Sequence, residues 1–167
     1  MPDRNESKTV DTAAAIARRR KALAFTLQGQ EYAVDIHQAT EVLDVLAVTR
    51  IPHMPDFVKG AMNLRGEILT VLDLRPFCGL RTVRRMDPAK VIVTDITGLA
   101  VGILVDGVKG TLEVSPDEIQ PPLSTLNEET KGHVVGQVRL KDRVVVWLDF
   151  QSILQSERVA QLRRITA

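Results

Sequence analysis

The chain has 167 residues, of which 44% are hydrophobic and only 4% aromatic, and its 22 Lys and Arg nearly balance 21 Asp and Glu. This length suits one domain, or two small lobes that share a core. The net charge of +1 excludes a strong overall field toward nucleic acid or acidic lipid, and few rings are available for stacking on bases. The apolar runs are too short to span a bilayer, and the N-terminus has no signal-peptide pattern, so we expect a cytoplasmic protein.

The residue types that usually carry chemistry are sparse. Cys78 is the single cysteine and has no partner for an internal disulfide. His37, His53 and His133 are scattered, without a carboxylate or thiol at metal-ligand spacing. The chain contains no P-loop, nucleophile elbow or dinucleotide-binding motif. We therefore expect no catalytic site, no metal and no cofactor.

Residues 1–21 mix charged and small residues and end in a basic run, which predicts a flexible N-terminal tail. From Leu23 onward, short β-branched runs alternate with period two and are separated by turn residues. This pattern predicts strands at 23–27, 32–36, 41–48, 61–64, 68–72, 91–96, 99–105, 108–114, 134–140 and 144–148. Helix is expected only as short turns at 55–59 and 74–80 and as a terminal segment from 150 to about 162.

The chain repeats itself with an offset of 76 residues. The first copy is Val58, Gly60, Leu64, Arg65, Leu72-Asp73-Leu74 and Phe77, and the second is Val134, Gly136, Leu140, Lys141, Leu148-Asp149-Phe150 and Ile153. A looser match pairs 33–36 with 100–103. The alternative is chance likeness between two hairpins of a chain rich in Val and Leu. The repeat predicts two small antiparallel barrels side by side, with a groove between them.

Four polar residues of these segments invite an interpretation. Asp73 and Asp149 each stand where a strand gives way to a predicted helix, so they are expected to cap its first turn. Glu41 and Arg65 interrupt apolar strands. Periodicity alone explains both by a place on the solvent face of the strand.

Residues 51–75, which read IPHMPDFVKGAMNLRGEILTVLDLR, closely resemble the signature of the CheW family of chemotaxis coupling proteins. Flanking segments extend the resemblance from about Leu23 to Leu154. It implies an all-β fold with minor helix, in which two five-stranded SH3-like barrels form one CheW-like domain over 22–156. The first lobe would span about 37–85 and the second 22–36 with 86–156, with exchange of strands between lobes allowed. Residues 157–167 would form the C-terminal helix end or tail.

The resemblance also implies a function. Members of this family are non-enzymatic adaptors that couple methyl-accepting chemoreceptors to the histidine kinase CheA at the inner face of the membrane. The implied partners are the receptor's cytoplasmic hairpin tip and the regulatory domain of CheA, with no nucleic acid, no membrane insertion and at most weak self-association. By motif position, binding is assigned to Ala39, Glu41, Val42, Gly60, Asn63, Arg65, Gly102 and Val108. Glu41 and Arg65 are expected to form an ion pair at the rim of the groove.

Alternatives stay open at this point. Thr70 stands where the family often has proline, and the N-terminal extension is longer than the barrel requires, so the pathway could instead be a related one that controls gliding, pili or biofilm. A small barrel protein that binds nucleic acid is a second alternative, disfavoured by the near-neutral charge. An enzyme with a cryptic groove site and a homo-oligomeric structural protein are the remaining ones.

Overall fold

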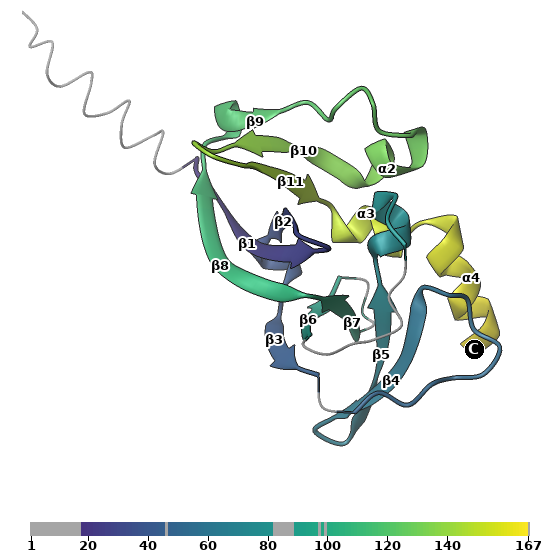
Figure 1. The fold of residues 1–167 in the computed structure, drawn as a ribbon. Helices are drawn as coiled ribbons and strands as arrows, with labels where there is room; N and C mark the ends of the chain where they lie inside the picture. The colour runs from purple at the N-terminus through teal and green to yellow at the C-terminus, as the bar shows by residue number, and fades with distance from the viewer. Residues whose placement is uncertain (1–17, 46, 82–88, 97, 99, 167) are drawn as a thin grey trace, which may run out of the picture.

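The computed structural model describes residues 18–45, 47–81, 89–96, 98 and 100–166. Its strands form two sheets, one above the other in Figure 1. Residues 1–17 of the tail predicted at 1–21 lie outside the described residues. Arg20 and Lys21, however, already belong to the first strand, so the prediction is wrong at its end.

Lobe 1 is the five-stranded sheet, with the order β3-β6-β7-β5-β4. Its strands are β3 (Glu41–Asp44), β4 (Val58–Leu64), β5 (Glu67–Asp73), β6 (Lys90–Asp95) and β7 (Ala100–Val105). Lobe 2 has the order β8-β1-β2-β11-β10-β9. Its strands are β1 (Arg20–Leu27), β2 (Gln30–Asp35), β8 (Gly107–Val114), β9 (Ile119–Gln120), β10 (Val134–Arg139) and β11 (Val144–Leu148).

Short helical segments lie between or after the strands. They are η1 (Ile36–Gln38), η2 (Arg75–Cys78), η3 (Pro116–Glu118), α2 (Glu128–His133), α3 (Phe150–Leu154) and α4 (Glu157–Thr166). Of these, α2, α3 and α4 are on the same side of the molecule in Figure 1. The expected terminal helix is thus split in two, and the turn expected at 55–59 is not helical. Helix α2 was not predicted from the sequence. It begins at an Asn127 cap whose side chain accepts a hydrogen bond from Thr130 N.

The all-β fold with minor helix is confirmed, but the predicted division between the lobes is wrong. Strands β6 and β7 were expected in lobe 2, and they pair with β3 and β5 of lobe 1. The reason is a parallel pairing of β5 with β7, in which Leu72 lies opposite Ile103. Periodicity cannot predict a partner of this kind, because it reports which face of a strand is buried and not which strand lies beside it. Lobe 2 also has six strands rather than five.

Each sheet curls round on itself. The chain that leaves the strand at one edge of the sheet next pairs with a strand at the opposite edge. After β3, Thr49 exchanges two backbone hydrogen bonds of 2.8 Å with Ala61 of β4. In the same way, β8 continues through η3 into β9, which pairs with β10 at Gln120 and Gln137. The described end strands are therefore joined through the chain, which gives each lobe a barrel-like form.

The repeat of 76 residues is structural. Both copies have a bulge in the same place, after Val58 in β4 and after Val134 in β10. A Cβ built on Gly60 would lie 2.2 Å from Thr49 O, and one on Gly136 would lie 2.3 Å from Gln120 O. The looser match is off by two residues, because Val34 pairs with Leu148 as Ile103 pairs with Leu72.

Buried apolar residues form three clusters. One fills lobe 2 around Trp147, and one fills lobe 1 around Val71 and Leu104. The largest contains residues of both lobes, including Phe25 and Phe77. Most of the space between the lobes is therefore packed, and burial there supplies roughly 1.5–3 kcal/mol for each large side chain.

The two bulge glycines allow a test of this arrangement. We expect Gly136→Ala to lower the free energy of unfolding by about 1–3 kcal/mol, because the new methyl group meets a backbone oxygen that cannot rotate away. Gly132→Ala is the matched control, since nothing lies within 4 Å of its built Cβ and helical Ala is favoured by roughly 0.5–1 kcal/mol. Urea denaturation checks both. Equal stability of the Gly136→Ala variant and the wild type would contradict the close approach of β9 to β10.

Candidate functional site

A tight turn joins β4 to β5 and carries Arg65 at its tip. Arg65 and Gly66 both adopt left-handed backbone conformations, with φ of 51° and 87°, as in the two-residue turns that match the twist of a hairpin. The Asn63 side chain accepts a hydrogen bond of 2.9 Å from Gly66 N. Asn63 thus holds the turn, and the turn presents the Arg65 side chain to solvent.

The expected ion pair between Arg65 and Glu41 is present. Arg65 Nη2 lies 2.5 Å from Glu41 Oε2. Glu41 is on β3 and Arg65 follows β4, so the pair connects the two end strands of lobe 1. The Arg65 side chain is 69% exposed, and an ion pair in contact with water contributes about 1 kcal/mol or less to stability. Both charges remain accessible to a partner.

Two exposed apolar side chains lie on strands next to this ion pair in the sequence, Val42 on β3 and Ile68 on β5. Ile68 is 81% exposed and Val42 is 39% exposed. Ile68 pairs across the hairpin with Asn63. On β5, Leu69 and Val71 fill the lobe interior, whereas Leu72 packs in the core between the lobes. Ile68 is on the outward-facing side beyond the part of the strand that lobe 2 covers.

Ile68 was not among the binding residues predicted from the sequence. Its exposure follows from where the cover of β5 ends, which depends on how the two lobes pack. The only signal in the sequence is the alternation along 68–72, in which Ile68 is out of phase with Leu69 and Val71.

The other predicted binding residues do not all gather at this tip. Ala39 and Val108 are half-buried and pack against the core between the lobes. Gly102 faces the interior of lobe 1, where a Cβ would lie 2.6 Å from Val91 Cγ1. Gly60 forms the bulge described above. The structure thus brings Glu41, Asn63 and Arg65 together, adds Val42 beside Glu41 on β3, and gives the two glycines a packing role.

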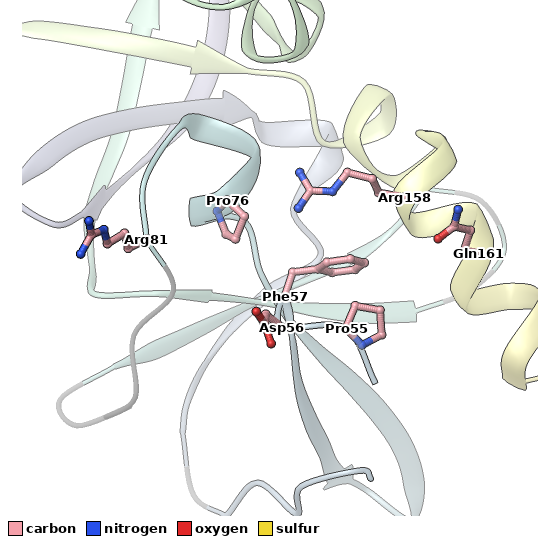
Figure 2. Close-up of a pocket in the computed structure, with 7 residues that line it drawn as sticks. All are labelled: Pro55, Asp56, Phe57, Pro76, Arg81, Arg158 and Gln161. Atoms are coloured by element: carbon pink, nitrogen blue, oxygen red, sulfur yellow. The ribbon is translucent and has the colours of Figure 1, made fainter. Parts of the chain in front are cut away.

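A hollow of about 670 Å³ lies at the other end of β4, some 20 Å from the tip by the length of the strand. Figure 2 shows Arg158 reaching from α4 over Phe57 toward Pro76. The Arg158 guanidinium lies 4.4 Å from the centroid of Phe77 and 2.7 Å from Glu129. The residues that line the hollow are Pro55, Asp56, Phe57, Pro76, Arg81, Arg158 and Gln161. One carboxylate among arginines, prolines and an amide suits contact with another molecule rather than acid–base chemistry.

Potential nucleophiles and bases nearby are held inactive. Burial raises the pKa of Cys78 to about 12, helped by the Asp73 carboxylate, so its reactive thiolate is scarce at neutral pH. His133 Nδ1 lies 3.0 Å from Ser152 Oγ, and that hydroxyl donates to Gly132 O. His133 therefore donates to Ser152, which orients a neutral ring against Phe77.

Within the described part of the chain, no three His, Cys, Asp or Glu side chains are arranged to hold a metal ion. None of the described helices is long and apolar enough to cross a membrane. The accessible surface of the site consists of a charged pair, a rigid turn and an apolar side chain.

The burial of His133 has a consequence for pH dependence. Burial lowers its pKa below the usual 6.5, and the nearby Glu129 and Asp149 offset this only in part, while Arg158 adds to it. The unfolded chain then binds the proton more readily, so acid removes stability as the pH falls through about 6.5. We expect the wild type to lose more stability than His133→Asn between pH 7.5 and 5.5. Urea denaturation at the two pH values checks this, and an equal loss in both proteins would contradict it.

Comparison with known proteins identifies what this chain resembles. The CheW-like domain family model matches residues 21–158. The chemotaxis protein CheW of Klebsiella aerogenes is 35% identical over 138 residues, which are 83% of each chain. CheW of Rhizobium meliloti is 29% identical over 138 residues, which are 83% of this chain and 89% of that protein. The crystal structure of the scaffolding protein TtCheW from Thermoanaerobacter tengcongensis superposes with a TM-score of 0.71 at 26% identity, covering 83% of this chain and 90% of that one.

Proposed function

Because the chain belongs to the CheW-like domain family and is an adaptor of chemotaxis, we propose that it couples methyl-accepting chemoreceptors to the histidine kinase CheA. It catalyses no reaction itself in this proposal. It acts in the cytoplasm, at the inner face of the membrane, where its receptors hold it. Its partners are the receptor's hairpin tip and the regulatory domain of the kinase.

The observation that carries the proposal is the tip of the hairpin formed by β4 and β5. It combines a charged pair, Arg65 with Glu41, and a large exposed apolar side chain, Ile68. Arginine is among the residues that most often dominate the binding energy of protein interfaces, and the buried core of an interface is apolar. The left-handed turn and the Asn63 hydrogen bond fix the backbone of the tip. Binding of a partner therefore costs little conformational entropy at this surface.

The arrangement suits a helical partner. A helix docks by placing apolar residues, spaced three or four apart, against apolar side chains of the recognising surface. Ile68 provides such a contact on β5. The charges of Glu41 and Arg65 would then select the register of the helix by pairing with its polar side chains.

Substitutions at the tip test the proposal. We expect Arg65→Ala and Ile68→Ser each to weaken binding of a purified receptor cytoplasmic fragment or of the CheA regulatory domain at least about tenfold. Their unfolding free energies should change by about 1 kcal/mol or less, because both side chains are exposed. Isothermal titration calorimetry measures the binding, and urea denaturation measures the stability.

The matched control is Lys21→Ala. Lys21 also forms an exposed ion pair, with Glu113 at 3.5 Å, but on lobe 2. This variant should bind as the wild type does if the tip is the contact surface. The charge reversal Glu41→Arg with Arg65→Glu restores the pair without restoring the original charges, so it should stay folded and bind poorly. Full binding by the reversed pair would assign Arg65 and Glu41 a structural role only, and loss of fold in Arg65→Ala would do the same.

A further inference from the structure

The chain passes between the two lobes twice within the β-sheet region. It leaves lobe 2 after β2 through η1 and enters lobe 1 at β3. It returns from β7 to β8, with Asp106 as the residue between these strands. In Figure 1 both connections lie where the two sheets meet. Side chains of both passages make long-range hydrogen bonds, and these share a pattern.

The second passage is held by charges. Asp106 Oδ1 pairs with Arg75 Nη2, and Arg75 Nη1 donates to Asp73 Oδ1 at 3.0 Å. Asp73 is the last residue of β5. The other Asp106 oxygen accepts from Gln28 N at 2.6 Å, and Asp106 N donates to Thr26 O at 2.9 Å. Asp106 therefore joins the end of β5 in lobe 1 to the hairpin of β1 and β2 in lobe 2.

The first passage is held by a neutral side chain. Gln38 Nε2 donates to Asp149 Oδ1 at 3.1 Å, and Gln38 Oε1 accepts from Phe150 N at 2.9 Å. Asp149 directly follows β11 of lobe 2. It is the residue that the repeat of 76 pairs with Asp73. In both halves, then, the passage that leaves a lobe is tied to the aspartate at the end of one strand of the repeat, β5 in lobe 1 and β11 in lobe 2.

Part of the charged connection is buried at a cost. Arg75 is 1% exposed and Asp73 is fully buried, whereas the Asp106 side chain is 41% exposed. Among the described residues, Arg75 Nε has no hydrogen-bond partner, and Asp73 Oδ2 makes an ion-pair contact at 3.8 Å with Lys59. Buried ion pairs contribute little net stability compared with apolar packing, and their best attested role is to select one arrangement. The hydrophobic attraction between the lobes is non-directional and does not by itself specify an angle.

We propose that Gln38 and the Arg75–Asp106 pair are positioning residues that set the angle between the two lobes. They act on the two passages, and each passage is anchored to the equivalent aspartate of the repeat. The angle would then determine how surfaces on the two lobes are presented to different partners. This consequence rests on the proposed adaptor function.

The distance between the lobes tests the proposal without any partner. Spin labels would be placed on exposed positions of each lobe, at Glu67→Cys and Lys141→Cys, in a Cys78→Ser background, and the distance distribution measured by double electron–electron resonance. We expect Gln38→Ala with Asp106→Ala to shift and broaden the distribution, since the side chains of both anchors are removed. Gln38→Ala alone should give a smaller change in the same direction. An unchanged distribution in the folded double variant would overturn the proposal.

The matched control is Asp44→Asn, which removes an exposed ion pair with Lys90 within lobe 1. It should leave the distribution as in the wild type, and an equal broadening there would also overturn the proposal. Should the double variant not fold, Gln38→Ala decides the question, because it retains the charged anchor. Failure of the adaptor function would leave this measurement unaffected, so the two ideas fail separately.

Discussion

The structure depends on the parallel pairing of β2 with β11, which joins the first hairpin of the chain to its last strand. Tyr32 and Val34 lie opposite Val146 and Leu148. Lobe 1 is continuous from β3 to β7, but lobe 2 is complete only when β1 and β2 take the positions that β6 and β7 hold in lobe 1. The hairpin at the beginning of the described chain therefore closes the second copy of the repeat and links both copies into one cooperative unit.

This arrangement explains where the candidate binding surface lies. The outward face of β5 packs under lobe 2 at Leu72 and is uncovered at Ile68. The uncovered end carries the rigid turn with Arg65, paired to Glu41 from the opposite end of the sheet. An adaptor needs surfaces that are rigid yet exposed, and the edge of a packed contact between two lobes provides both properties.

Most strands of the fold and one ion pair of the candidate site could be predicted from the sequence. The alternation of apolar residues located most of the strands, and the repeat of 76 residues predicted two related lobes, in which the structure shows a bulge at the same place. The ion pair of Glu41 with Arg65 was also predicted and is present. These features depend on local pattern or on a motif.

What the sequence did not predict depends on partners far apart in the chain. The place of β6 and β7 in lobe 1 follows from the parallel pairing with β5, for which no local signal exists. The exposure of Ile68 and the burial of Arg75 follow from the packing of one lobe on the other. A basic residue that follows a strand looks solvated in the sequence, because one of its two carboxylate partners, Asp106, is 31 residues away.

An adaptor of this kind joins a receptor and a kinase in one assembly. Sedimentation velocity of a purified receptor cytoplasmic fragment and CheA, with and without the protein, can detect that assembly. We expect a faster-sedimenting complex that contains all three components and forms only when the protein is present. The same sedimentation of receptor and kinase in its presence and absence would contradict the proposed coupling.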